Sequence, residues 1–517
     1  MKNQVILINP SPEGFIFKGI PLNSYLYTKV RAIYKAVRKP NAKLTFISPL
    51  NVLSIGTALK AAGYKPIIID GTAEDVRDKI RIHLDENTLF VGISAMTGSQ
   101  ITFGLKSAKF VRNINPNIPL VWGGLHPTVL PEETLSTSKY ADIVCIGEGE
   151  ITIVELANAL QNNSPLDKID GIAFKDSNGN VIKNNERKRL NFSELPPVDF
   201  DLMDKDVFDF TLMMSYQSSR GCPHRCKFCE VSPIHNNTYR FKSSETILTE
   251  IEDLVNHYGV KEIILIDENF FVNRNRAIRF AQGIIERNIS IRWRAMCRDD
   301  YFRKTDVEFW SLMKKSGCKN IMIGAESGSQ RVLDIIQKDA TVEDIINAAR
   351  QLSAADISSS YSFVCGFPDE TKEDIQETIK LCKYLLKNFK NVGVYEIFVY
   401  MPLPMTGFYE DVKARGCEFP NKLEDWGNFL FNGKKYIKWH PLSEYIFRVS
   451  MAAKWNVRPS VSLIFGRLIR LDFWVFLLFL CGYCCSYRWK YQYYGFPIDI
   501  YILHLLDRFI YRYSKQK

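Results

Sequence analysis

Three cysteines that could bind a metal cluster lie close together near the middle of the chain. They are Cys222, Cys226 and Cys229, and their C-x3-C-x2-C spacing allows one loop to hold three corners of a cuboidal four-iron four-sulfur cluster. The motif offers no fourth thiolate, so one iron would keep an open position where a substrate can bind. Zinc is the alternative metal, but His224 lies between two of the cysteines, where its geometry for a fourth bond is poor. The spacing therefore favours an iron–sulfur cluster.

The elements that must position this loop form a series of alternating strands and helices. An apolar strand directly precedes the cysteines, and five further strands follow, each separated from the next by a helical pattern. Two of the helices begin with capping boxes, at 341–344 and 371–374. The strands are expected at 212–217, 262–267, 292–297, 320–324, 360–365 and 393–400. This order predicts a partial TIM barrel, whose chemistry should lie at the carboxyl ends of its strands.

Charged residues and a glycine turn occur where these predicted strands end. The candidates are Asp267 and Glu268 after the second strand, Arg298 after the third, Glu326 after the fourth and Gly366 after the fifth. Because the carboxyl ends of the strands meet at one end of a barrel, these residues should surround the cysteine loop. A carboxylate in front of a helix can also be a simple charge partner of the helix N-terminus, and that alternative stays open for the acidic residues.

The cysteine loop, with Phe228 just before its last cysteine, resembles the signature of the radical S-adenosylmethionine (SAM) superfamily. The resemblance implies that the three cysteines hold the cluster and that its open iron chelates the amino and carboxylate groups of SAM. Electron transfer would then cleave the sulfonium and form a 5′-deoxyadenosyl radical. It also implies an electron donor such as flavodoxin or ferredoxin as a partner. Phe228 resembles the position whose backbone meets the adenine.

The same resemblance assigns cofactor contacts to the strand ends. Asp267 and Glu268 occupy the place where relatives bind the methionine amino group, although the usual Gly-Gly-Glu form is absent. Glu326 resembles a ribose or methionine contact, and Gly366 lies in a turn similar to the adenine-binding turn of relatives. Arg298 is expected at the cofactor as well. No residue is assigned a role as catalytic acid or base.

A second α/β pattern precedes the barrel. Fully apolar strands alternate with helices up to about residue 160, which indicates a doubly wound, Rossmann-like parallel sheet. In such sheets ligands bind beyond the carboxyl ends of the strands, and here those ends are rich in turn residues. A single glycine often does no more than let the chain turn, but several on one edge favour a ligand.

This N-terminal domain resembles the cobalamin-binding domain of one large subclass of the superfamily. The likeness rests on Trp122-Gly123-Gly124 and on Gly147-Glu148-Gly149-Glu150, whose small residues would let a corrin approach the sheet edge. The residues expected at the cobalamin are Ser94, Thr97, Gly123, Gly124, Gly147, Glu148 and Gly149. The first loop, 9–14, lacks the Asp-x-His-x-x-Gly pattern that supplies a lower axial histidine to cobalt. The corrin would therefore bind without that histidine, or the domain would have lost the cofactor.

The chain is thus expected to have four segments. They are a cobalamin-binding-like domain at 1–160, a connector with a hairpin at 161–210, the radical SAM partial barrel at 211–430 and a helical C-terminal region at 431–517. The composition, with 46% hydrophobic and 24% charged residues, is typical of folded globular proteins and excludes a disordered one. No nucleic-acid partner is expected.

The C-terminal region contains an uncharged run, 473–487, which is shorter than the about 20 residues that a membrane-spanning helix needs. Its basic and aromatic flanks suit peripheral contact with a membrane, and burial of the run against the barrel is the alternative. Cys481, Cys484 and Cys485 lie in this run without a nearby His or carboxylate pair to complete a metal site. The N-terminal segment lacks the apolar core of a signal peptide, so we expect a cytoplasmic protein, with the tail able to reach the inner face of the membrane.

These patterns together predict a cobalamin-dependent radical SAM enzyme that methylates an unactivated carbon of a small molecule, with lipophilic substrates among the candidates. Two alternatives remain open. One is a radical SAM oxidative cyclase or oxidoreductase, as in the anaerobic porphyrin-ring cyclases, in which no methyl group is delivered. The other is a cofactor-binding sensor without turnover, which the intact cysteine triad disfavours because a sensor would not need an open iron.

Overall fold

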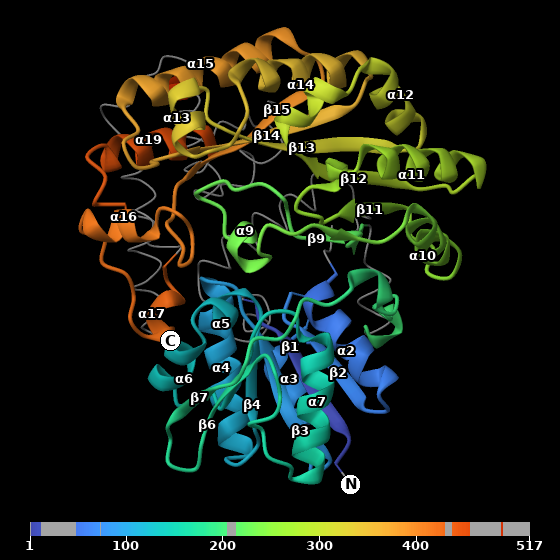
Figure 1. The fold of residues 1–517 in the computed structure, drawn as a ribbon, viewed down its shortest axis with the longest axis vertical. Coiled ribbons are helices and arrows are strands. Elements are labelled where there is room, and N and C mark those ends of the chain that lie inside the picture. Colours follow the sequence, from blue (N-terminus) through green and yellow to red (C-terminus); the bar gives the residue numbers. More distant parts are fainter. Residues whose placement is uncertain are drawn as a thin grey trace, which may run out of the picture.

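The structure is a computed structural model and describes residues 2–11, 48–72, 74–203, 213–429, 437–454 and 487–489. These residues form two α/β units, each built around a sheet of mainly parallel strands. In Figure 1 the N-terminal unit, coloured blue to teal, lies below the second unit, coloured green to orange. The helix α9 (Val231–Ile234) and the short strand β9 (Ser219–Arg220) lie in the layer between them. The predicted order, a doubly wound domain followed by a partial barrel, is confirmed.

The sheet of the N-terminal unit has the strand order β2-β1-β3-β4-β5-β6-β7. Its parallel strands are β1 (Gln4–Asn9), β2 (Lys65–Asp70), β3 (Thr88–Ser94), β4 (Leu120–Gly123) and β5 (Ile143–Cys145). The chain moves from β1 to β2 on one side and then returns to β3 on the other, so the strand order reverses at β1. Such a reversal opens a crevice between the loops that follow the two central strands, and ligands bind there.

Helices cover both faces of this sheet, which explains why its strands are apolar throughout. α2 (Leu50–Ala61) and α7 (Gly149–Asn162) pack on one face, and α3 (Val76–His83) and α4 (Ser99–Ile114) pack on the other. All six residues of β1 are buried as a result. Strands that are buried on both faces have near-continuous hydrophobic sequences, which is the pattern from which the fold was predicted. The short helices α5 (Leu125–Val129) and α6 (Pro131–Thr137) follow β4.

The hairpin that we expected in the connector belongs to the first sheet. β6 (Ile172–Lys175) pairs antiparallel with β5, and β7 (Val181–Lys183) pairs antiparallel with β6. Its turn contains Gly179, at a φ of +83°. An unpaired edge strand exposes a row of backbone donors and acceptors, and the hairpin covers that edge of β5. The first unit therefore continues beyond the expected end near residue 160, because its sheet ends at residue 183.

Six parallel strands form the second sheet, in the order β15-β14-β13-β12-β11-β8. They are β8 (Met214–Tyr216), β11 (Glu262–Leu265), β12 (Arg292–Cys297), β13 (Cys318–Glu326), β14 (Ser358–Cys365) and β15 (Val392–Val399). The strands follow one another in sequence, and β8 and β15 do not pair within the described residues. This is the open, partial barrel that the strand–helix alternation predicted.

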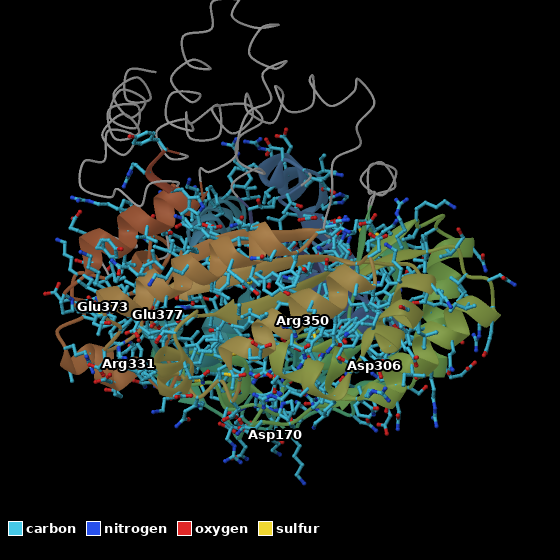
Figure 2. The ribbon with its side chains drawn as sticks, turned by 90° about the horizontal axis from the view of Figure 1, so that it is seen from above. Asp170, Asp306, Arg331, Arg350, Glu373 and Glu377 are labelled. Atoms are coloured by element: carbon cyan, nitrogen blue, oxygen red, sulfur yellow. The ribbon has the colours of Figure 1, made fainter. Side chains whose placement is uncertain are left out.

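The barrel helices form an outer layer over this sheet (Figure 1). They are α10 (Ser244–Asn256), α11 (Arg274–Glu286), α12 (Val307–Lys315), α13 (Gln330–Ile335), α14 (Val342–Ala354) and α15 (Lys372–Asn388). Both predicted capping boxes are present, at the starts of α14 and α15. α14 turns Ile345 and Leu352 into the core and leaves Arg350 exposed. Figure 2 shows Arg350, with Glu373 of α15, on the outside of the molecule.

The chain after β15 crosses back to the N-terminal unit through α16 (Tyr409–Ala414) and α17 (Leu423–Trp426), as the orange ribbon in Figure 1 shows. Trp426 is fully buried there, and its Nε1 donates to Glu133 Oε1 at 2.6 Å. The chain then returns to the barrel, where α19 (Ser443–Lys454) packs on β15. This part of the C-terminal region therefore ties the two units together.

The tail contributes few described residues. No helix in the described part of the chain is both long enough and apolar enough to cross a membrane. The uncharged run up to residue 486, including Cys481, Cys484 and Cys485, lies outside the described residues. Trp489 is one of the aromatic residues that follow the uncharged run and that suited a membrane contact. It packs instead into the hydrophobic core of the barrel. That residue supports the alternative in which part of the tail is buried against the protein.

Candidate active site

The cysteine loop leaves the carboxyl end of the barrel through a short ribbon formed by β9 and β10 (Arg240–Phe241). Gly221 follows β9 with a φ of +84°, and a Cβ atom on it would lie 2.3 Å from the carbonyl oxygen of Thr238. Glycine is therefore required immediately before Cys222. Farther along, the Lys227 N–H donates to the Ile336 carbonyl at 3.0 Å, which fastens the loop to the segment after β13.

The surroundings of the three thiols fit an iron–sulfur cluster. Burial by itself disfavours the thiolate form of two of these thiols: it raises the pKa of Cys222, and it raises the pKa of Cys229 to about 12. Arg298 Nη1 lies 3.1 Å from the Sγ atom of Cys226, where it can stabilise a thiolate. Within the described residues, no three Cys, His, Asp or Glu side chains converge on a single metal ion. A cuboidal cluster does not need such convergence, because each of its thiolates binds a different iron.

His224, which lies between two of the cysteines, has a hydrogen-bond partner outside the motif. Its Nε2 atom lies 3.0 Å from the hydroxyl of Tyr301, and burial lowers the pKa of the imidazole to about 4. The ring is therefore neutral at physiological pH and already has a hydrogen-bond partner outside the motif.

Asp267 and Glu268 have different environments, although the sequence suggested the same role for both. Asp267 is fully buried. Its carboxylate accepts hydrogen bonds from the backbone N–H groups of Ser218 and Ser219, at 2.7 and 3.1 Å, and from the hydroxyl of Ser219 at 2.7 Å. Arg276 lies 3.5 Å from the same carboxylate. Asp267 therefore serves to hold the strand in front of the cysteine loop, and the structure does not support it as a SAM contact. Glu268 accepts from the Gly221 N–H at 3.2 Å, directly beside the cysteines.

A group of buried charges lies next to Cys226, and one member, Lys338, was not found from the sequence. Lys338 is 2% exposed, and its Nζ lies 3.4 Å from Asp299 and 3.7 Å from Glu326. Burial raises the pKa of Asp299 to about 6, although the charge of Lys338 opposes the rise. Lys338 sits in an irregular segment with no periodic pattern, so no local sequence signal marks it. Arg298 joins this group by donating a hydrogen bond to the Lys338 carbonyl oxygen, and it also forms a 2.9 Å ion pair with Asp300.

Glu326 itself ends β13 in an unusual backbone conformation. Its φ is +63°, in the left-handed region that costs a non-glycine residue free energy. Its carboxylate lies over Gly324, where a Cβ atom would be 2.4 Å from Oε1. The backbone and the glycine together direct the Glu326 carboxylate toward Lys338.

Phe228 contacts the turn that follows β14. The resemblance to radical SAM enzymes implied that both contact the adenine of SAM. The Phe228 ring lies 5.6 Å from the ring of Phe367, centroid to centroid. Gly366 has a φ of +99°, and its N–H and that of Phe367 both donate to Glu370. A Cβ atom on Gly366 would lie 2.7 Å from Ile437, so the C-terminal region covers this turn.

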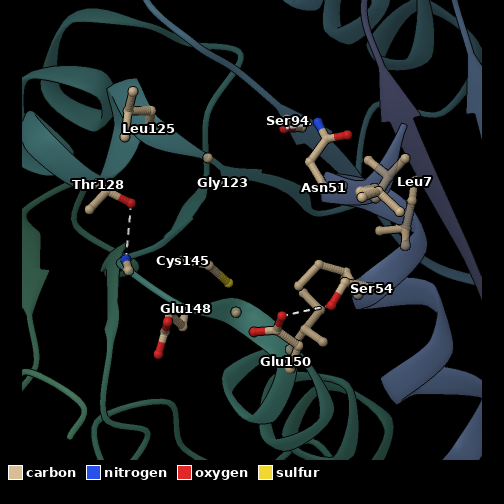
Figure 3. A pocket seen from close by; sticks show the side chains of 18 of the residues that line it. Leu7, Asn51, Ser54, Ser94, Gly123, Leu125, Thr128, Cys145, Glu148 and Glu150 are labelled. Carbon is tan, nitrogen blue, oxygen red and sulfur yellow. Dashed lines mark hydrogen bonds between the residues drawn. The ribbon is translucent and has the colours of Figure 1, made fainter. Parts of the chain in front are cut away.

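A cavity of about 370 Å³ lies at the carboxyl edge of the first sheet (Figure 3). Most of the residues predicted to bind cobalamin line it, namely Ser94, Gly123, Gly124, Gly147, Glu148 and Gly149. The deepest part of the cavity reaches between the strands and α7 and is lined by Leu7, Gly92 and Cys145. Thr128 accepts a hydrogen bond from the Gly147 N–H at 2.9 Å and so joins the loops after β4 and β5.

Thr97 is the exception among the predicted cobalamin residues. It does not line the cavity, and its hydroxyl lies 3.0 Å from His126 Nδ1 behind the cavity wall. A Cβ atom on Gly149 would lie 2.8 Å from the end of the Ile55 side chain, so a larger residue there would require that side chain to move. Asn9 is the last residue of β1, and its side-chain amide donates a hydrogen bond to Asp70 Oδ1 at 2.9 Å.

The far wall of the same cavity comes from the barrel unit. Gln217 and Ile266 follow strands β8 and β11 of the second sheet, Arg220 lies in the ribbon strand β9, and Ile234 and His235 follow the cysteine loop. The two strand-end surfaces therefore share one cavity. A group bound in the first unit would lie against the segment that carries the cysteines.

The comparisons with known proteins agree with this arrangement. Residues 44–157 match the B12 binding domain, and residues 216–382 match the Radical SAM superfamily. The fold and the site define a radical SAM enzyme with an N-terminal cobalamin-binding domain, and the chain belongs to this family. Its cofactors are therefore a four-iron four-sulfur cluster, SAM and cobalamin.

Particular relatives include both methyltransferases and cyclases. An uncharacterised methyltransferase of Pyrococcus horikoshii is 34% identical over 348 residues, which cover 66% of this chain and 74% of that protein. The anaerobic magnesium-protoporphyrin IX monomethyl ester cyclase of Rubrivivax gelatinosus is 26% identical over 378 residues, covering 70% of this chain and 66% of the cyclase. The solved structure of the cobalamin-dependent SAM radical enzyme OxsB, with aqua-cobalamin and SAM bound, matches with a TM-score of 0.68 at 18% identity, over 99% of this chain and 75% of OxsB.

The cysteine assignment can be tested by iron content. We expect the triple variant Cys222→Ala, Cys226→Ala, Cys229→Ala to lose its iron and the visible absorbance of the cluster after anaerobic reconstitution. Cys382→Ala, which removes a fully buried thiol from α15, should keep both. A triple variant that retained a full cluster would overturn the assignment and direct attention to Cys481, Cys484 and Cys485.

Glu370 should give stability a measurable pH dependence. Burial raises its pKa to about 8, although the N–H groups of Gly366 and Phe367 oppose the rise. The carboxyl is then protonated in the folded protein but ionised in the unfolded chain between about pH 4.3 and 8, so the free energy of unfolding falls with pH by up to about 1.4 kcal/mol per unit. Glu370→Gln should lose this slope in urea denaturation from pH 5 to 8.5. Parallel profiles for the two proteins would show that Glu370 is ionised in the folded state.

Proposed function

We propose that this protein is a cobalamin-dependent radical SAM methyltransferase that acts on an unactivated carbon of a small molecule. The observation that carries the proposal is the shared cavity. Its glycine-rich wall belongs to the cobalamin-binding unit, and its opposite wall contains Arg220, two residues before the first cysteine. A corrin held there would face the site of SAM, as transfer between the two cofactors requires.

On the barrel side, the three cysteines would hold the cluster, which supplies the electron that cleaves the sulfonium of SAM. Glu268, next to Gly221, is the carboxylate best placed to accept the amino group of the methionine moiety. Glu326, backed by the buried Lys338, would accept from a ribose hydroxyl. Phe228 and the turn at Gly366 would contact the adenine.

On the other side, Gly123, Gly124, Gly147 and Gly149 would let the corrin approach the sheet edge, and the deep part of the cavity would take the nucleotide tail. Ser94 can donate a hydrogen bond at this edge, and it already receives one from Asn51 at 2.8 Å. The absence of a histidine from the segment 9–14 supports a cobalt whose lower face has no ligand from that loop.

The substrate would enter from the concave side of the barrel. Alternate residues of β12 point away from the core, and Met296 at its end is 40% exposed. On β15, Phe398 is 39% exposed and Tyr395 is 74% exposed. These apolar side chains support a small lipophilic substrate. The relatives that are cyclases favour a second candidate, an oxidative ring closure on such a substrate without methyl transfer.

The two candidate reactions differ in their products. Methylation should consume two molecules of SAM and give S-adenosylhomocysteine and 5′-deoxyadenosine in proportion to product, whereas cyclisation should give 5′-deoxyadenosine alone. Mass spectrometry of an anaerobic reaction in a cell extract measures all three species. A product without the mass of an added methylene unit, formed without S-adenosylhomocysteine, would reject the methyltransferase and favour the cyclase.

We further propose that a small redox protein such as flavodoxin or ferredoxin reduces the cluster, and that the tail from residue 461 contacts a membrane surface. The tail sequence supports the second point, because 461–517 carries more Lys and Arg than Asp and Glu beside its apolar run. The exposed Arg225 at the tip of the cysteine loop supports an acidic donor at that place.

Membrane contact can be tested by sedimentation with liposomes. We expect the full-length protein to pellet with anionic liposomes at low salt and to pellet less at high salt, because screening weakens the electrostatic part of binding. Neutral liposomes are the control. Protein that stays in the supernatant with anionic liposomes at low salt would show that the tail is a buried part of the enzyme.

A further inference from the structure

Two arginines and two glutamates join the cobalamin-binding unit to the segment that carries the cysteines. Arg220 of β9 lies 2.5 Å from Glu150 and 3.5 Å from Glu148. Arg240 of β10 holds Glu148 with both terminal nitrogens, at 2.7 and 2.8 Å. Arg220 and Arg240 face each other in the ribbon, so we refer to these four residues as the interdomain ion-pair cluster.

The cluster is shielded from water, which makes its contacts directional and hard to break. The side chains of Arg220, Glu148 and Glu150 are 12%, 9% and 6% exposed. Burial alone would raise the pKa of Glu148, but the hydrogen bond from Arg240 and the two guanidinium charges lower it to about 2. A buried pair that loses one partner leaves an uncompensated charge, which is strongly unfavourable.

Each side of the interdomain ion-pair cluster continues directly into a cofactor loop. Glu148 stands between Gly147 and Gly149, which line the cavity of the first unit. Arg220 precedes Gly221 and Cys222, and the strand before it is held by Asp267. A shift of one ion pair would therefore move the corrin-facing loop relative to the cysteine loop. The sequence suggested that Glu148 contacts cobalamin, but its carboxylate is occupied by Arg240, Arg220 and the Leu190 N–H.

We infer that Arg220 is a positioning residue that sets the separation between cobalamin and SAM. The inference rests on the proposed function, since it assumes that both cofactors act on one substrate. Arg220 touches no reacting atom, and its guanidinium is held on three sides, by Glu150, by Gln217 at 3.0 Å and by the ring of Phe192 at 4.7 Å. The loss of its ion pairs should leave SAM cleavage active and should impair transfer between the cofactors.

The test uses the double variant Arg220→Gln, Glu150→Gln in the full-length protein loaded with all its cofactors. The double substitution avoids a single buried unpaired charge, so the protein should fold. Both residues line the shared cavity, so iron and cobalamin contents are measured first and all rates are expressed per loaded enzyme. We compare the rates of 5′-deoxyadenosine and methylated-product formation and expect the amount of methylated product per 5′-deoxyadenosine to fall about 10- to 100-fold, because a misplacement near 1 Å can have that effect. Arg287→Gln, which removes ion pairs to Glu245 and Glu252 within the barrel unit, is the matched control and should change neither rate.

A second readout does not depend on turnover. The magnetic coupling between cobalt(II) and the reduced cluster depends on their separation, so its electron paramagnetic resonance spectrum should change in the double variant and remain unchanged in Arg287→Gln. A double variant with the wild-type coupling and the wild-type product ratio would overturn the inference and leave the cluster a stabilising role alone. If the wild type forms no methylated product, the proposed function fails. The magnetic coupling between cobalt(II) and the iron–sulfur cluster then still shows whether Arg220 sets the distance between the two cofactors.

Discussion

The buried carboxylate of Asp267 is the interaction on which the site depends. It lies at the end of β11 and accepts the N–H groups and hydroxyls of Ser218 and Ser219 with no exposure to water. A buried charge is stable only when its hydrogen bonds are satisfied, so Asp267 fixes the direction in which the chain leaves β8. That direction places Arg220 against the first unit and starts the cysteine loop at the barrel mouth.

Buried charge is concentrated around this loop to an extent that stability alone would not favour. Lys338, Asp299 and Glu326 form a compact group beside Arg298, and Arg298 in turn contacts Cys226. Removing such groups from water costs free energy, which ion pairing offsets in part. Proteins accept these costs at functional sites, where a fixed arrangement of charge is useful when an anionic cofactor binds.

One short segment of the first unit serves both sides of the interface. In the sequence Gly147-Glu148-Gly149-Glu150, the glycines leave room in the cavity, and the glutamates turn toward Arg220 and Arg240. The strap of α16 and α17 adds a second connection, through Trp426 and Glu133. The cavity walls are therefore held from two directions, and the relative position of the units is part of the site.

Local sequence determined much of this protein. The cysteine spacing, the alternation of strands and helices, and the capping boxes of α14 and α15 depend on residues close together in the chain, so the sequence alone predicted the two folds and the cluster loop. The tertiary structure decided which polar residues are available to cofactors. Asp267 accepts hydrogen bonds from Ser218 and Ser219, which precede it by 49 and 48 residues. Glu148 is bound by Arg240, 92 residues later in the chain, and Lys338 contacts Asp299 only because the barrel folds. Such partners are set by the packing of distant elements, and no local pattern reports them.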